Sequence, residues 1–384
     1  MKWTWTIRAW CKSRRDRARW RGVSNVTIAS AITIAQSLAS IDQAGAATPA
    51  GKAELVRLVR TGAGGSDVLA RVSLAMSGPI QRTAEDVELL LAHAQMSWIA
   101  DQRNPEASRA RDSARALIEL VPDLADGYRL LGFAHLTRGD YRDAFLAFSA
   151  VKTLPTPANY DNFRALARLL MTGTKQARFE LAGERYSFDL TTHNAAAVES
   201  SAFHAVGALT EWEELQYLAA TLPREKTRRI VEVGVLLGNH SAFFLKAMRP
   251  DSITLIDGDP ANIPFIERTV FYNLPEPRPT VDVQCAFVAG AIGEGTFAGA
   301  KIQKKPLVDL VHGGVDFLKI DVDGGERHLL NGAVAVIETS RPAVMIETTP
   351  TTHQAVVAWF AERQYKTTKV FDRGSHRNVV LMPS

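Results

Sequence analysis

The pattern of apolar and polar positions divides the chain into two halves. From residue 26 to about residue 170, apolar residues recur at helical spacing, and runs of β-branched residues are few. After about residue 178, short apolar runs alternate with helical patterns. The sequence therefore predicts an all-α domain over residues 26–177 and an α/β domain over residues 178–384.

The second half has the pattern of a doubly wound sheet. Alternating strands and helices predict a parallel sheet with helices on both faces. The last two strands are separated only by Asp372-Arg-Gly-Ser, which predicts a hairpin and one antiparallel strand near the sheet edge. The predicted strands are residues 229–233, 253–256, 281–288, 315–320, 343–347, 365–371 and 378–382, and the predicted helices begin near Ser241, Ala261, Glu326 and Thr352.

One segment of the helical half follows the consensus of a tetratricopeptide repeat. Small residues at Gly132 and Ala144 would let two antiparallel helices approach closely, and Phe148 would fill the space beside them. A weaker copy lies upstream, where Ala110 precedes Ala144 by 34 residues. These observations predict a short array of helical repeats. The matching positions are Tyr128, Leu131, Gly132, His135, Gly139, Tyr141, Ala144, Phe148 and Pro155.

The turns after the first two predicted strands carry candidate ligand-binding residues. Gly234 and Gly238 form a G-x3-G pattern, which differs from the G-x-G-x-x-G loop that holds a pyrophosphate and so argues against NAD or FAD. Asp257 lies 23 residues after Gly234, where an acid can accept hydrogen bonds from ribose hydroxyls. The alternative for Asp257 is a turn residue, although Asp259 before Pro260 suits that role better.

A cluster of acids follows the strand predicted at residues 315–320. Asp321 and Asp323 project to the same side if the segment is extended, and Glu326 lies one helical turn further on. Together they could hold a divalent cation through oxygen ligands, or one of them could act as a base. The alternative is a capping box, in which Asp323 and Glu326 only begin the next helix.

Two further polar residues lie near these strand ends. His240, in the first turn of a predicted helix, is a candidate base or substrate ligand, and the alternative is a packed or solvated histidine. Lys319 lies among apolar neighbours in a predicted strand, which fits either an active-site lysine or a structural ion pair. Glu347 ends the fifth strand and adds another carboxylate to the same edge.

These residues belong to motifs that resemble the FkbM-type S-adenosylmethionine-dependent methyltransferases over roughly residues 180–384. The resemblance implies a Rossmann-like class I sheet with strand order 3-2-1-4-5-7-6 and methylation of a hydroxyl on a sugar, glycan or secondary metabolite. The motifs are Val231-Glu-Val-Gly-x3-Gly-Asn-His-Ser, Leu255-Ile-Asp-Gly-Asp-Pro, Asn273-Leu, Asp316-Phe-Leu-Lys-Ile-Asp-Val-Asp-Gly-Gly-Glu, Leu330-Asn-Gly-Ala and Arg341-Pro-Ala-Val-Met-Ile-Glu.

The resemblance also implies roles for single residues. Asp257 would contact the ribose of S-adenosylmethionine, and Asp321 would lie beside the methyl donor. The chain departs from the family pattern at Val235 and Leu236, where Ala-Asn is usual. This departure motivates an alternative hypothesis, a non-catalytic scaffold protein with a degenerate methyltransferase domain. The residues implied for the cofactor loop are Glu232, Gly234, Gly238 and Asn239.

Composition and charge suggest binding partners and a cellular compartment. Residues 1–22 hold eight of the basic residues against one acid and four of the seven tryptophans, so residues 1–25 are predicted to be a flexible leader that could contact an anionic membrane surface. The remainder is slightly acidic, which makes a nucleic-acid partner an unfavoured interpretation. Two cysteines, Cys11 and Cys285, provide no disulfide framework, and a cytoplasmic location is expected. The helical repeats would recruit a protein partner, the acceptor or a second copy.

Overall fold

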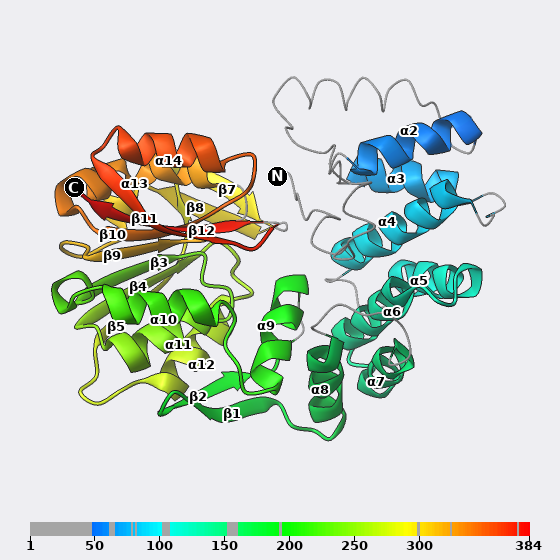
Figure 1. Cartoon of the computed structure of the whole chain (residues 1–384), viewed down its shortest axis with the longest axis horizontal. Coiled ribbons are helices and arrows are strands. Elements are labelled where there is room, and N and C mark those ends of the chain that lie inside the picture. The colour runs from blue at the N-terminus through cyan, green and yellow to red at the C-terminus, as the bar shows by residue number, and fades with distance from the viewer. Residues whose placement is uncertain are drawn as a thin grey trace. The chain divides into compact units, whose positions relative to one another are not determined.

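The computed structural model describes residues 48–60, 66–77, 80, 83–101, 108–151, 160–191, 194–297, 300–322, 325–374 and 376–384. The predicted basic leader and Asp323 lie outside these ranges. The described chain forms two compact units (Figure 1). One is helical and comprises the described residues up to Lys175 together with Leu190–Val206, and the other is an α/β unit of Gln176–Asp189 and Gly207–Ser384.

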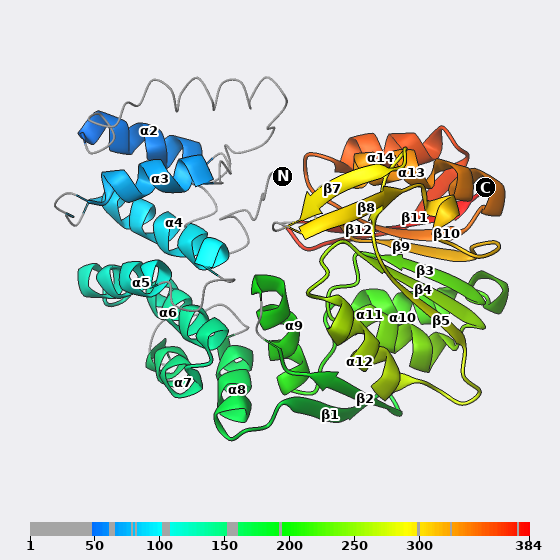
Figure 2. The same cartoon turned by 180° about the vertical axis from the view of Figure 1, so that it is seen from behind.

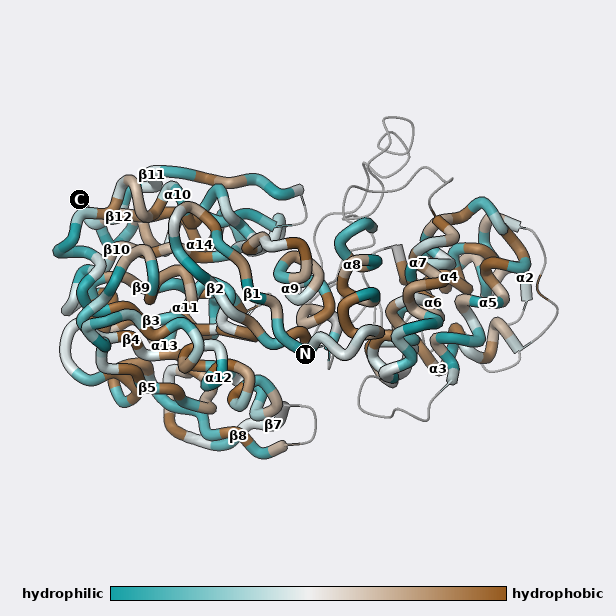
Figure 3. The backbone as a smooth tube through the Cα atoms, turned by 90° about the horizontal axis from the view of Figure 1, so that it is seen from below, coloured by the Kyte–Doolittle hydropathy of each residue, from teal (hydrophilic) through white to brown (hydrophobic). Residues whose placement is uncertain are grey.

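Consecutive helices of the helical unit pack against each other from α4 to α9. Hydrophobic and hydrophilic stretches alternate along α8 (Figure 3), which is the pattern of a helix that buries one stripe. Its helices are α2 (Pro49–Arg60), α3 (Ser66–Ala75), α4 (Ala84–Asp101), α5 (Arg109–Leu120), α6 (Ala125–Arg138), α7 (Tyr141–Ala150), α8 (Tyr160–Met171) and α9 (Ala195–Ala205).

A glycine allows α6 and α7 to pack closely. A Cβ atom at Gly132 would lie 2.4 Å from the ring of Phe148, which is buried. That ring in turn contacts the rings of Phe133 and Phe163, so it has no room to move aside. Gly139 ends α6 in the left-handed conformation, with φ of +82°. The helix pair therefore has the close contact that the sequence predicts, and the array of tetratricopeptide repeats stays a prediction.

A seven-stranded sheet forms the centre of the α/β unit, in the order β11-β12-β10-β9-β3-β4-β5. The order confirms the predicted 3-2-1-4-5-7-6 arrangement, and β12 is antiparallel to both of its neighbours. The strands are β3 (Arg229–Val233), β4 (Ser252–Asp257), β5 (Thr280–Cys285), β9 (Phe317–Ile320), β10 (Ala343–Thr348), β11 (Tyr365–Asp372) and β12 (Arg377–Pro383).

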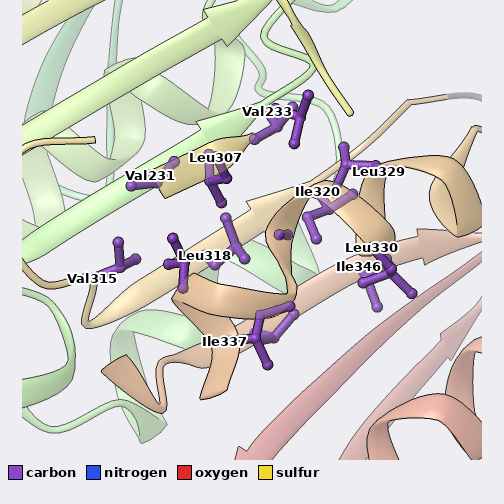
Figure 4. Packing of buried hydrophobic residues seen from close by; sticks show 14 of the residues in the cluster. Val231, Val233, Leu307, Val315, Leu318, Ile320, Leu329, Leu330, Ile337 and Ile346 are labelled. Atoms are coloured by element: carbon purple, nitrogen blue, oxygen red, sulfur yellow. The ribbon is translucent and has the colours of Figure 1, made fainter. Parts of the chain in front are cut away.

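Helices cover both faces of this sheet (Figure 1). Alternate strand residues point to opposite faces, so each central strand contributes to two apolar layers. Leu318 packs with α13 and α14, whereas its neighbour Phe317 packs with α10, α11 and α12. Figure 4 shows the first layer, with Ile320 of β9 facing Leu329 of α13. The helices are α10 (Trp212–Thr221), α11 (Asn239–Phe243) continued by the π-helical turn η5 (Phe244–Met248), α12 (Ile263–Asn273), α13 (Glu326–Ser340) and α14 (His353–Ala361).

The sequence analysis predicted no strand or helix in two segments that the structure folds into regular elements. Residues 290–306 contain two strands of a small three-stranded sheet of order β6-β8-β7, part of which Figure 2 shows outside the main sheet. The chain before the first strand of the main sheet contains a hairpin and α9. The additional elements are β1 (Gln176–Leu181), β2 (Glu184–Asp189), β6 (Phe287–Val288), β7 (Gly293–Phe297), β8 (Ala300–Lys305) and the 3-10 turns η4 (Arg224–Lys226) and η6 (Leu307–Asp309).

The two central strands carry a buried pair of opposite charges. Glu232 of β3 lies directly opposite Lys319 of β9, and both point to the face covered by α10, α11 and α12. Glu232 is 1% exposed and Lys319 is 2% exposed. The Lys319 ammonium lies 3.6 Å from Oε1 of Glu232 and 2.9 Å from Oδ2 of Asp321. The buried lysine is therefore paired, and it joins the ends of neighbouring strands.

Among the residues that the structure describes, we find no helix with the length and apolarity required to cross a membrane.

Removing the lysine should destabilise the α/β unit. Lys319→Met leaves Glu232 buried without its opposite charge, so we expect the free energy of unfolding to fall by about 3–5 kcal/mol in urea titrations. The double variant Glu232→Gln/Lys319→Met should recover part of this loss, because it buries no unpaired charge. A loss below about 1 kcal/mol in the single variant would show that Glu232 does not depend on Lys319.

A methyl group at Gly132 should destabilise the helical unit. Gly132→Ala forces the Phe148 ring out of its place, and overpacking of this kind costs about 1–3 kcal/mol in urea unfolding. Gly132→Ala/Phe148→Leu should be more stable than Gly132→Ala, because the smaller side chain makes room. Leu146→Ala on the exposed side of α7 serves as control and should change stability by no more than about 0.5 kcal/mol.

Candidate active site

The predicted site residues meet at the carboxyl edge of the main sheet. Parallel strands β3, β4, β9 and β10 all end there, and β12, which runs in the opposite direction, begins there. In open α/β sheets this edge is where ligands bind. The turn between β3 and α11, which we call the glycine loop (residues 234–238), lies at the same edge.

The glycine loop is pressed against the end of β9. Gly234 has φ of +83°, and a Cβ atom there would lie only 1.6 Å from the carbonyl oxygen of Asp321. The amide of Gly234 donates to the carbonyl of Ile256, and the amide of Asp321 donates to the carbonyl of Val233, each at 2.9 Å. Only glycine fits between these backbones. The glycine loop and the acidic end of β9 are therefore in contact.

Two more left-handed residues shape the same loop. Gly238 has φ of +81°, and a Cβ atom there would lie 2.9 Å from Cγ2 of Thr269. Leu236 has φ of +58°, a conformation that costs a non-glycine residue about 1 kcal/mol. The surrounding contacts hold this strained turn in place.

Asp257, at the end of β4, holds the glycine loop. Its Oδ2 accepts from the amides of Val235 and Leu236 at 3.0 and 2.8 Å. Its Oδ1 accepts from the amide of Asp259 at 2.8 Å and from Nδ2 of Asn262 at 3.1 Å. Burial raises the pKa of Asp257, although these four donors act in the opposite direction. A carboxylate has about four acceptor positions, so a ribose hydroxyl would have to replace one of these donors.

Asp259 and Asn239 act on the backbone of the chain. Asp259 accepts from the amide of Ala261 at 2.9 Å, which is the turn role that the sequence suggested. The Asn239 amide pairs with the backbone of Thr210, accepting at 3.1 Å and donating at 3.2 Å. Asn239 thus fixes the segment before α10, and with it Glu211.

The Lys319 ammonium lies close to acidic and carbonyl groups at the ends of two strands, β3 and β9. Besides Glu232 and Asp321, it lies 3.5 Å from the carbonyl of Gly234. Burial alone would lower the pKa of Lys319, but the negative charges of Asp321, Glu232 and Glu211 raise it above its usual value. Lys319 therefore stays protonated and cannot serve as a base. Glu232 accepts from the hydroxyl of Ser241 at 2.6 Å, and burial raises its pKa.

Glu211 is a site residue that the sequence analysis missed. Its Oε2 lies 3.1 Å from Nε2 of His240, and its Oε1 accepts from Nδ2 of Asn378 at 2.7 Å. Oε1 also lies 3.4 Å from Nε2 of His376. Burial would raise the pKa of Glu211, but His240, His376 and the charge of Lys319 lower it well below its usual value.

His376 directly precedes β12, and because β12 is antiparallel to β10, His376 lies at this edge. Glu347 of β10 lies opposite Asn378 of β12, and the Glu347 carboxylate is 3.7 Å from Nε2 of His376. Sequence reasoning could have found His376, because the start of an antiparallel last strand must lie beside the end of its neighbour. Glu211 could not be found this way, because it precedes a helix and belongs to no strand.

Glu326 lies at the start of α13. Its side chain is fully buried, and Gly325 is the preceding cap residue. Asp323, its partner in the predicted capping box, lies outside the described residues, so the box stays a prediction. Within the described ranges, the groups close enough to share a cation are Glu211–His240–Asp321 and Glu211–Glu347–His376, and Glu326 belongs to neither.

Comparison with known proteins identifies the C-terminal part of the chain. Residues 286–367 match the family model described as a methyltransferase FkbM domain. This stretch runs from β6 into β11 and contains Lys319 and Asp321, whereas Gly234 and Asp257 precede it. A sequence comparison with characterised proteins found no match.

Two solved methyltransferases have low structural similarity to the chain. A methyltransferase FkbM from Methylobacillus flagellatus KT is 16% identical, with a TM-score of 0.39, over 66% of this chain and 62% of that chain. A precorrin-6y C5,15-methyltransferase from Geobacter metallireducens GS-15 is 14% identical, with a TM-score of 0.34, over 46% of this chain and 90% of that chain. The present chain thus spans about three-fifths of the Methylobacillus protein. On the match to residues 286–367, the C-terminal part of the chain contains an FkbM methyltransferase domain.

Proposed function

We propose that the α/β unit is an S-adenosylmethionine-dependent methyltransferase that methylates a hydroxyl group of a sugar, glycan or secondary metabolite. The observation that carries the proposal is the contact between the glycine loop and the end of β9, where Gly234 meets the carbonyl of Asp321. It unites a turn typical of nucleoside binding with an acidic strand end inside the matched domain.

The residues of this edge fit the chemistry of S-adenosylmethionine. The cofactor is a nucleoside without phosphates, and the loop lacks the pattern that cradles a pyrophosphate. Its positive sulfonium suits an edge rich in carboxylates, where the backbone carbonyl of Asp321 meets the loop. Gly234, Gly238 and Asp257 would hold the nucleoside, and when bound the cofactor supplies an electrophilic methyl group.

Residues of the chain would align the methyl donor with the acceptor and would accept the proton. In methyl transfer the acceptor oxygen forms a bond to the methyl carbon, the carbon–sulfur bond breaks, and its electron pair stays on sulfur. The hydroxyl proton would pass to the carboxylates around Asp321, because Lys319 is already protonated. Holding donor and acceptor in line provides much of the rate enhancement.

We assign recruitment of the acceptor, or of a protein that carries it, to the helical unit. The helices of this unit contribute no residue to the proposed methyl transfer, and stacked pairs of helices commonly form binding surfaces. A non-catalytic scaffold is the competing function, motivated by Val235 and Leu236, and the ligand-binding measurement below separates the two.

Calorimetry of the full chain with S-adenosylhomocysteine tests the proposal. We expect saturable binding in the micromolar range, and a loss of about tenfold or more in Asp257→Ala, because the loop amides lose their acceptor. Asp309→Asn, an exposed acid in η6, is the control and should bind as the wild type does. No heat with either the methyl donor or its product in the folded wild-type protein would contradict the proposal and favour the scaffold.

A methyl group at Gly234 should weaken cofactor binding. Gly234→Ala places a Cβ atom where the Asp321 carbonyl lies, so the glycine loop and the end of β9 must separate. We expect at least a roughly tenfold loss of affinity for S-adenosylhomocysteine. Gly293→Ala is the matched control, because nothing lies within 4 Å of the added atom. Equal affinities of the two variants would show that the loop takes no part in binding.

A further inference from the structure

Several carboxylates come together at the carboxyl edge of the main sheet. Four carboxylates of this edge lie around one lysine and two histidines. Buried charges are normally paired or bind a cation, so a cluster of this kind is a candidate cation site. The residues are Glu211, Glu232, Asp321, Glu347, Lys319, His240 and His376.

Two buried atoms of this group face each other without a hydrogen bond. Nε2 of His240 lies 3.1 Å from Oε2 of Glu211, and both atoms are inaccessible and lack a hydrogen-bond partner. His240 is 6% exposed. The other oxygen of Glu211 is held by Asn378, which fixes the direction of Oε2. An imidazole nitrogen and a carboxylate oxygen so placed are a preformed pair of ligands.

We propose that Glu211, His240 and Asp321 bind a divalent first-row metal ion, for which Mn²⁺ is the reference. Their ligand atoms lie within 4.8 Å of one another. Neighbouring ligands of an octahedral ion at about 2.1–2.2 Å are about 3 Å apart, close to the His240–Glu211 separation of 3.1 Å. One imidazole with two carboxylates suits Mn²⁺, Fe²⁺ or Zn²⁺ better than Ca²⁺, which takes oxygen ligands.

The surroundings of the three ligands fit this assignment. Lys319 binds Oδ2 of Asp321 and thereby orients the carboxylate. Oε1 of Glu232 lies 3.9 Å from Nδ1 of His240, on the side away from Glu211. Carboxylates behind a ligating histidine commonly fix its ring and increase its basicity. The ligands come from the segment before α10, the start of α11 and the end of β9, so the ion would join three separate elements.

A bound ion would take part in the proposed methyl transfer, and this role of the ion rests on the proposed function. A divalent cation lowers the pKa of a coordinated hydroxyl and positions its oxygen. Open coordination positions beside three protein ligands would favour acceptors with two adjacent oxygens, such as a vicinal diol. A sulfonium alone could neutralise charge here, but it requires no nitrogen ligand and does not account for His240.

Titration of the tag-free, chelator-treated full chain with Mn²⁺ tests the site without any cofactor. Free Mn²⁺ is measured by electron paramagnetic resonance and binding heat by calorimetry. We expect one ion per chain, and affinity at least about tenfold weaker in Glu211→Gln, His240→Gln and Asp321→Asn. His312→Gln, an exposed histidine before β9, is the matched control and should bind as the wild type does. Circular dichroism checks that each variant is folded.

A spectroscopic measurement on the wild type keeps the test decisive if a variant fails to fold. Electron spin-echo spectra of the Mn²⁺ protein should contain the modulation of one directly bound imidazole nitrogen. Absence of Mn²⁺ and Zn²⁺ binding to the wild type, or binding that is unchanged in all three folded ligand variants, would overturn the proposal.

Titrating S-adenosylhomocysteine into the same metal-free protein separates this proposal from the proposed function. Cofactor binding without metal binding would overturn the metal site and leave methyl transfer standing. Metal binding without cofactor binding would support the site and contradict methyl transfer.

Discussion

The contact between the glycine loop and the end of β9 is the constraint on which the rest of the carboxyl edge depends. With no side chain at Gly234, the first turn of the sheet can lie against the Asp321 carbonyl. Lys319 strengthens this contact, since its ammonium lies close to the Gly234 carbonyl and to the carboxylates of Asp321 and Glu232. The energy of burying these charges is recovered only in one register of β3 against β9. The same register brings Glu232 and its neighbour His240 beneath Asp321.

Much of this architecture could be predicted, because the buried strands are short apolar runs whose ends are marked by glycine, proline or acid. The seven strands of the main sheet and their order follow from this pattern and from the family resemblance. The sheet β6-β8-β7 could not be predicted, since β7 contains two glycines and β8 three lysines, and neither alternates strictly between apolar and polar residues. The hairpin β1–β2 was missed because its strands bury few positions and have charged residues at many others.

The site was predicted where motifs supply the residues and missed where tertiary folding supplies them. Glu232, Asp257 and Asp321 lie at the ends of parallel strands or directly after them, so their place at one edge follows from topology alone. The hydrogen-bonding partners of these residues do not follow from topology, and those partners change the roles of the residues. Asp257 and Asn239, expected to contact a cofactor, are also engaged in holding the backbone of the glycine loop and of Thr210. Asn239 fixes the segment that carries Glu211, and Asn378 holds its carboxylate at the edge.

Because the carboxyl edge depends on a residue outside the motifs, a substitution outside the motifs can alter it. Glu211 lies before the first strand of the main sheet and outside the motifs of the sequence. The Asn239–Thr210 link holds only the backbone there, and it places no demand on which side chain occupies position 211. A single substitution at position 211 would therefore change the charge at the sheet edge while the glycine loop keeps its backbone contacts.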